Sequence, residues 1–132
     1  MSAQTAIVRG RRVAEALMVD ACTIRRRTGE ATDPNSGVIT PTYGADLYSG
    51  KCRVQQRQLG GQGQNVGEAY VIVERYEVHL PMSVTGLLEG DQITITASAL
   101  DPDLVDRVFI VRDVAAKSHL TARRVGVTEV TS

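Results

Sequence analysis

Short β-patterned runs recur about every dozen residues along the 132-residue chain, with turn-favouring residues between them. Residues 92–97, Gln-Ile-Thr-Ile-Thr-Ala, alternate apolar and polar side chains, and residues 105–114 form an apolar run around Arg107 and Arg112. Strands joined by short turns pair antiparallel, whereas parallel strands need helical crossovers that this pattern does not supply. The sequence therefore predicts one mainly β domain over residues 1–132, an antiparallel β-barrel or sandwich of about seven strands at residues 20–131.

The first half of this predicted sheet is a hairpin. Residues 20–27 form its first strand, with Cys22 and Ile24 facing inward, and Asp-Pro-Asn-Ser-Gly at 33–37 makes the turn because Pro presets φ and Asn and Gly tolerate positive φ. Residues 38–47 return as an edge or bulged strand, since Pro41 lacks a ladder donor. A second turn is predicted at Ser49-Gly50, and residues 121–130 close the sheet.

One helix precedes the sheet. Ser2 can cap it, and it runs to about Met18. The apolar side of this helix is predicted to hold Ile7, Val13, Ala14, Leu17 and Met18, with Arg9, Arg12 and Glu15 opposite. Gly10 weakens the middle by about 1 kcal/mol relative to Ala. The helix is thus expected to be completed by contacts with its own barrel or with another subunit.

The centre of the chain carries two strands and an unusually long connection. Residues 51–57 place Cys52 and Val54 on one face, and residues 70–80 are the strongest strand pattern in the sequence. The intervening loop, residues 58–68, is longer than a hairpin turn requires. Its uncharged part is Gln58, Leu59, Gly60, Gly61, Gln62, Gly63, Gln64, Asn65, Val66 and Gly67. Either this is an idle surface loop, or copies from several subunits meet at a shared axis.

Composition and charge limit the cellular compartment and the kind of binding partner that we expect for the protein. Net charge is zero, but residues 1–57 hold nine Lys/Arg against five Asp/Glu and residues 58–132 hold six against ten, so the halves are about +4 and −4. Such opposed halves suit contacts between proteins, although charges interleaved on a solvated surface would look the same. Cys22 and Cys52 are expected to be free and buried, because two cysteines make no disulfide framework. With neither a signal peptide nor an apolar run of about 20 residues, we expect a cytoplasmically made protein that does not enter a membrane.

Nothing in the sequence favours an enzyme, a cofactor or a metal. The histidines are His79, expected to face outward on a strand, and His119 in a loop, and neither has a ligand at metal-site spacing. Asp101, Asp103 and Asp106 are expected to form an acidic turn. The glycine-rich loop leads into a strand instead of a helix and lacks the following Lys-Ser/Thr, so it is no phosphate-binding loop.

After the basic helix, several segments follow in a fixed order: Cys22-Thr23-Ile24-Arg25-Arg26-Arg27-Thr28-Gly29, Gly37-Val38-Ile39-Thr40-Pro41-Thr42-Tyr43, Tyr48-Ser49-Gly50-Lys51-Cys52-Arg53-Val54, the long polar loop, Arg75-Tyr76-Glu77-Val78, Gly90-Asp91 and Val108-Phe109-Ile110-Val111. In this order they resemble the head-completion proteins of tailed bacteriophages, the stopper or head-closure proteins of the head-tail connector. The order of these segments is similar to that in the small neck proteins of long-tailed phages, particularly those of actinobacterial hosts. A departure from commoner joining proteins is the absence of tryptophan in the strand around Cys52.

The resemblance implies a virion protein, assembled in the host cytoplasm as a sixfold or twelvefold ring. The ring would lie between the portal or adaptor above and the tail terminator or tail tube below, retaining packaged DNA by non-specific contacts. Two alternatives stay open: a tail terminator or other tail-ring subunit, and a small nucleic-acid-binding barrel. The sequence lacks the interleaved aromatic residues and the net positive charge that a nucleic-acid-binding barrel would need.

Two sets of residues are predicted to contact neighbouring rings. The central loop, residues 58–68, would narrow the channel or order against the next ring. The second set is basic and comprises Arg9, Arg11, Arg12, Arg25, Arg26 and Arg27. For the triplet at 25–27, a solvated strand end is the plainer alternative.

Overall fold

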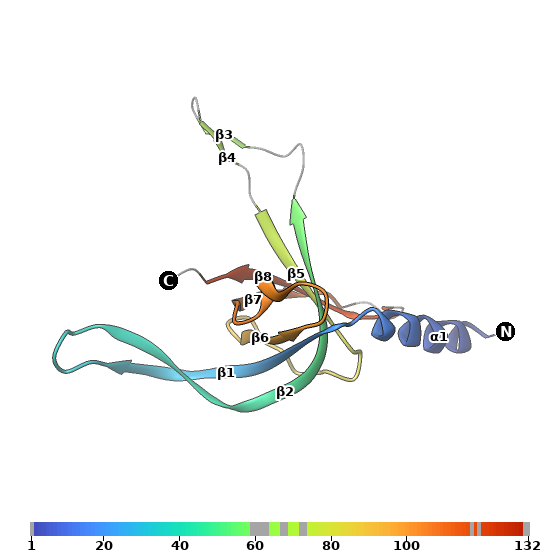
Figure 1. Cartoon of the computed structure of the whole chain (residues 1–132), viewed down its shortest axis with the longest axis horizontal. Helices are drawn as coiled ribbons and strands as arrows, with labels where there is room; N and C mark the ends of the chain where they lie inside the picture. Colours follow the sequence, from blue (N-terminus) through green and yellow to red (C-terminus); the bar gives the residue numbers. More distant parts are fainter. Residues whose placement is uncertain are drawn as a thin grey trace.

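The computed structural model describes residues 2–58, 64–66, 69–71, 74–116, 118 and 120–130. Within them the chain forms one α-helix, one short 3-10 helix and eight strands (Figure 1). In chain order these are α1 (Ala3–Ala16), β1 (Asp20–Thr32), β2 (Ile39–Gln58), β3 (Gln64–Val66), β4 (Ala69–Val71), β5 (Glu74–Leu80), β6 (Gln92–Ser98), η1 (Pro102–Leu104), β7 (Val108–Val114) and β8 (Arg123–Glu129).

Six of these strands close an antiparallel barrel in the order β1-β2-β5-β8-β7-β6. Alternating side chains from all six point inward and are fully or almost fully buried, as the period of a strand requires. This core comprises Cys22, Ile24, Cys52, Val78, Leu80, Ile93, Ile95, Phe109, Val111, Val125 and Val127. The predicted mainly β fold with one N-terminal helix is confirmed, and so are the free, buried cysteines.

Helix α1 begins where the sequence predicted. The Ser2 hydroxyl accepts a hydrogen bond from the Thr5 amide at 3.2 Å, which satisfies one of the unpaired N–H groups of the first turn. The partly covered residues of the helix recur every three or four positions, as expected for a helix lying against a barrel. They are Ile7, Gly10, Arg11, Ala14 and Glu15.

Two residues of the predicted apolar side do not pack on the barrel: Val13 and Leu17 are 65% and 52% exposed. The barrel contact includes Gly10, where a Cβ atom would lie 2.7 Å from the Thr121 Cγ2 atom. The missing side chain lets the helix backbone approach the barrel at this position.

The hairpin of β1 and β2 extends far beyond the barrel (Figure 1). Strand β6 pairs with β1 only over residues 20–25, and β5 pairs with β2 only over residues 53–58, whereas β1 and β2 pair with each other out to Thr32 and Ile39. We call residues 26–45 the arm. Pro41 lies in it opposite Glu30, on an edge strand as predicted.

The turn at the arm tip has the predicted chemistry. The Asp33 carboxylate accepts a hydrogen bond from the Asn35 amide at 2.9 Å, and Gly37 has a φ of +72°, a conformation that glycine adopts without strain. The second predicted turn, at Ser49-Gly50, is wrong. Both residues pair within the ladder, and Gly50 makes room for the Tyr48 side chain, whose hydroxyl would lie 2.7 Å from a Cβ atom at position 50.

The central region differs from its prediction. The run at residues 70–80 is divided between β4, which pairs with β3 in a separate two-stranded sheet, and β5 in the barrel. Strand β3 lies within the predicted loop. Figure 1 shows β3 and β4 beyond the ends of β2 and β5, away from the barrel.

The last third of the chain follows the prediction with shorter strands. Residues 102–104 are the helix η1 instead of an open loop, because the Asp101 carboxylate caps it by accepting from the Asp103 amide at 3.0 Å. Residues 105–107 precede β7 instead of belonging to it, and Asp106 there has a φ of +70°.

The close approach at Gly10 gives a first prediction. Gly10→Ala should lower the free energy of unfolding by about 1 kcal/mol, because overpacking against Thr121 exceeds the gain in helix propensity. In a Thr121→Ser background, which removes the Cγ2 atom, the same substitution should instead raise it by about 1 kcal/mol. Urea unfolding of the four proteins measures both effects. Equal effects of Gly10→Ala in the two backgrounds would contradict the packing described for α1.

Candidate functional site

The loop at residues 81–91 crosses from β5 to β6, and arginine side chains hold it at two places. From β8, the Arg123 guanidinium donates to the Val84 carbonyl at 3.0 Å and to the Met82 carbonyl at 3.2 Å. These bonds satisfy carbonyls that no strand partner reaches. They fix the first half of the loop on the barrel.

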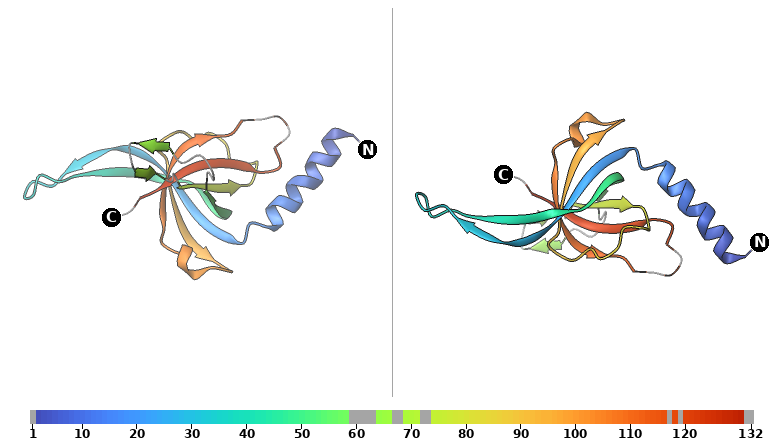
Figure 2. Two further views of the ribbon diagram at one scale, coloured as in Figure 1. Left: turned by 90° about the horizontal axis from the view of Figure 1, so that it is seen from above. Right: turned by 90° about the horizontal axis from the view of Figure 1, so that it is seen from below.

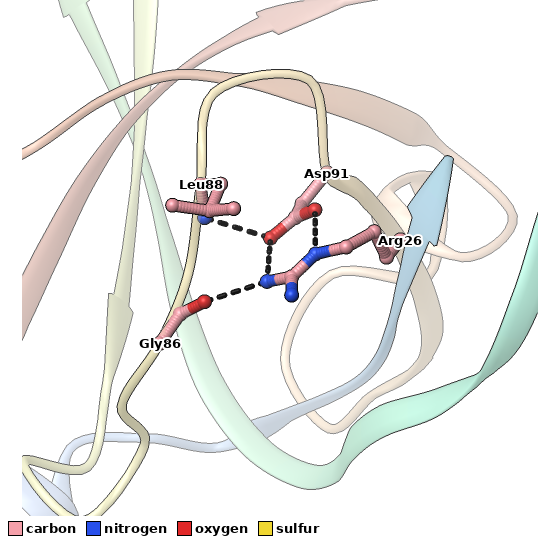
Figure 3. Close-up of polar contacts among 4 residues, drawn as sticks. All are labelled: Arg26, Gly86, Leu88 and Asp91. Atoms are coloured by element: carbon pink, nitrogen blue, oxygen red, sulfur yellow. Dashed lines mark hydrogen bonds and ion pairs between the residues drawn. The ribbon is translucent and has the colours of Figure 1, made fainter. Parts of the chain in front are cut away.

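The second attachment joins the loop to the root of the arm (Figure 3). Arg26 donates from Nε to Asp91 Oδ1 at 3.2 Å, and from Nη2 to Asp91 Oδ2 at 3.3 Å and to the Gly86 carbonyl at 2.6 Å. The same Asp91 Oδ2 atom accepts from the Leu88 amide at 2.8 Å. One carboxylate therefore holds both the loop backbone and the arm, in an arrangement that we call the clamp.

The surroundings of the clamp make it sensitive to loss of one partner. The Asp91 side chain is only 2% exposed, whereas that of Arg26 is 40% exposed. The hydrogen bond with Asp91 raises the pKa of Arg26 above its ordinary value. Solvent screens the attraction on the arginine side, but removing its partners would leave Asp91 as a buried charge without compensation.

Arg26 lies where the arm begins, so the clamp acts at the root of the arm. Arg25 is the last residue of β1 that pairs with β6, opposite Gln92, so Arg26 is the first residue of the arm. The ladder with β2 also shifts register between Ile24 and Arg25 and twice more before Gly29. Such irregularities bend and twist a strand pair, so the clamp fixes the arm at the point where its direction is set.

An open groove of about 640 Å³ lies beside the clamp, between the arm root at residues 26–30 and the loop at residues 88–91. Strand β1 has left its β6 partner there. Its outer edge can therefore accept a strand or loop of another protein by backbone hydrogen bonds. The residues that line the groove can offer hydrogen bonds and ion pairs to such a partner.

The structure separates the six predicted docking arginines into two groups. On β1, Arg25 pairs with Asp46 at 2.9 Å, Arg26 forms the clamp, and Arg27 pairs with Glu30. All three thus have acidic partners within the chain. Their docking role stays a prediction.

The other three predicted docking arginines lie on helix α1. Arg11 donates to the Leu120 carbonyl at 3.3 Å, while Arg9 and Arg12 are exposed. Lys51, on the barrel, pairs with Glu15 at 3.2 Å, so the segment before Glu15 carries positive charge alone.

The predicted channel loop is only partly within the described residues. Gln58 ends β2 opposite Glu74, and Gln64, Asn65 and Val66 form β3. The remaining predicted loop residues, 59–63 and 67–68, lie outside the described part of the chain. The proposed convergence of this loop on a channel stays a prediction.

The histidines and acidic residues do not assemble a metal site in the part of the chain that is described. His79 lies on the outer face of β5, but it is buried instead of exposed, with Nε2 at 2.5 Å from Glu77 Oε1. His119 lies outside the described residues. Among those described, no three His, Cys, Asp or Glu side chains are placed to hold a metal ion.

Sequence reasoning missed the clamp. It used Gly90-Asp91 as one segment of the resemblance, and it interpreted Arg26 as a docking residue or as part of a solvated strand end. The available signal was an acidic residue next to a turn glycine, Gly90, whose φ is +96°. Pairing it with Arg26 required the barrel register, which the sequence pattern does not specify.

Comparison with known families places the chain. The family described as "Family of unknown function (DUF6093)" matches residues 10–128, most of the chain. The chain belongs to this family. The match includes both halves of the clamp, the whole arm and the six barrel strands except Glu129, the last residue of β8. No curated protein matches the chain significantly.

The clamp gives a second prediction. Asp91→Asn should lower the free energy of unfolding by about 2 kcal/mol, because one carboxylate oxygen becomes an NH2 group that cannot accept from Arg26 Nε, and the negative charge that pairs with Arg26 is lost. Asp46→Asn is the matched control: its pair with Arg25 is half exposed on both sides, so the change should be within about 0.5 kcal/mol. Urea unfolding measures both variants. Equal losses would show that Asp91 does no more than a surface carboxylate.

Proposed function

We propose that the chain is a structural protein of the phage neck, a head-to-tail stopper or head-completion protein. It forms a ring between the portal or adaptor and the tail, retains packaged DNA and offers the platform to which the tail attaches. This proposal rests on the resemblance drawn from the sequence, and the arm is the structural observation that best supports it.

The arm is a structured element without a core of its own. Every residue from 30 to 42 is exposed, although β1 and β2 stay paired out to Thr32 and Ile39. A two-stranded ribbon is marginally stable alone, and its two edges carry unpaired backbone groups. An element of this kind gains its stability when a neighbouring subunit covers it, as happens in a ring of identical chains.

Helix α1 supports the same reading from the other end of the molecule. None of its residues is buried, and Val8, Val13 and the C-cap residue Leu17 are about half or more exposed. Apolar side chains left exposed along a helix can serve as contact surfaces. Figures 1 and 2 show the arm and the helix extending in opposite directions from the barrel, an arrangement that suits a head-to-tail interface that closes into a ring.

The nucleic-acid-binding alternative is less favoured, because the three consecutive arginines of β1 have acidic partners. Arg25, Arg26 and Arg27 pair with Asp46, Asp91 and Glu30, so their charge is compensated within the chain. Binding to DNA by the phosphate backbone needs several free cations. A tail terminator or another tail-ring subunit remains the second candidate, because ring assembly fits it equally well.

Residence in the virion is part of the proposal. In the described portion of the chain, no helix is long and apolar enough to cross a membrane. The partners proposed are further copies of the chain in a sixfold or twelvefold ring, the portal or adaptor, the tail terminator or tail tube, and DNA in the channel.

An arm-shortened variant tests the proposal. Replacing residues 29–42 by Asn-Gly keeps the clamp and the Arg25 pair with Asp46, so the barrel should keep its fold. In the phage that encodes the chain, a deletion complemented by this variant should give filled heads that lose DNA and fail to join tails. The Asp46→Asn chain, which keeps the arm, should restore infectious particles.

Electron microscopy of the particles and counting of copies per virion provide the readout. Full DNA retention and tail joining without the chain would overturn the assignment to the neck. A single copy per virion would overturn the ring.

A further inference from the structure

The two ends of the molecule carry opposite charges and exposed apolar side chains. Between residues 28 and 50 all charged side chains are acidic: Glu30, Asp33 and Asp46. Between residues 3 and 14 all charged side chains are arginines. Residues of opposite charge on separate faces of one chain attract neighbouring copies in a fixed orientation.

The tip of the arm presents two exposed apolar side chains next to a carboxylate for which the described residues provide no arginine partner. Val38 and Ile39 are 57% and 60% exposed and directly follow the turn. Glu30 and Asp46 are paired with Arg27 and Arg25, whereas Asp33 is engaged by the turn backbone. The Asn35 amide donates to Asp33 and lowers the pKa of Asp33, which keeps the carboxylate charged at neutral pH.

Helix α1 presents the complementary surface. A groove of about 430 Å³ runs along the first half of the helix, and most of its lining is apolar. Its lining residues are Ala3, Gln4, Ile7, Val8, Arg11 and Ser118. Arg12 lies one helical turn after Val8 on the same side and is exposed.

We infer that the arm tip of one copy docks on helix α1 of the next copy around the ring. Val38 and Ile39 fill the groove over Val8, and the Asp33 carboxylate pairs with the Arg12 guanidinium. The inference rests on the proposed ring and names the contact that builds it. Within one chain the contact does not form, because the arm tip and the helix lie at opposite ends (Figure 2).

Such a contact is heterologous, since two different surfaces meet, and its repetition by rotation closes a ring. The preformed turn and helix lose little conformational freedom when they meet, which favours binding. The acidic tip and basic helix also disfavour the tip-to-tip and helix-to-helix contacts that would stop the ring from growing.

Cysteine cross-linking tests the inference. The native Cys22 and Cys52 are fully buried, so cysteines introduced at Ile39 and Val8 are the accessible thiols. In rings assembled from the Ile39→Cys/Val8→Cys chain, oxidation should give a ladder of covalent oligomers up to the ring number. The matched control, Ile39→Cys/Leu100→Cys, uses a residue between β6 and η1 that is 80% exposed and should give no ladder.

Charge reversal provides the second measurement. Asp33→Lys or Arg12→Glu alone should raise the protomer concentration needed for ring assembly about tenfold, and the double reversal should restore it. Rings without the cross-link and without rescue would overturn the docking contact while leaving the proposed function standing. If connectors contain no ring of this chain, the proposed function fails, and the inference fails with it.

Discussion

The rest of the structure depends most on the hydrogen bonds that the buried carboxylate of Asp91 accepts. It accepts hydrogen bonds from the Leu88 amide within its own loop and from Arg26 on β1. A charge that is 2% exposed is tolerated only when its oxygens are all engaged. Because Asp91 is buried with these partners, the loop at residues 81–91 and the root of the arm must lie against each other.

The arm follows from this attachment and from the closure of the barrel. Strand β1 pairs on both sides over residues 20–25, so the start of the hairpin is as rigid as the core. After Arg25 the pairing of β1 with β6 ends, and the clamp holds β1 in place instead. The result is a two-stranded extension held firmly at its root and covered by nothing along its length. Its preorganisation would reduce the entropy lost when a partner subunit binds it.

The sequence predicted the parts of this fold that depend on local chemistry. The Ser2 cap, the turn at residues 33–37 and the alternating strand at residues 92–97 are specified by their own residues, and the structure confirms them. The position of Pro41 on an edge strand was predictable for the same reason, since Pro lacks an N–H group. These features need no knowledge of distant residues.

The errors occur where distant residues decide. Ser49-Gly50 has the composition of a turn, but pairing with β1 keeps it extended and Tyr48 occupies the space of the missing side chain. The close approach of α1 to the barrel at Gly10 involves Thr121, more than a hundred residues away. His79 alternates outward as predicted, yet it is buried next to Glu77. The clamp itself joins residues 65 positions apart, so only the barrel register brings it together.

The central claim is that the arm is an interface element that is uncovered in the free chain. Amide hydrogen exchange at residues 27–32 and 39–45, followed in the free chain and in assembled connectors, tests it most directly. The account predicts exchange at least a hundredfold faster than in β6 and β8 for the free chain, and strong slowing in the assembly. Arm amides that exchange at the free-chain rate within the assembled connector would contradict it.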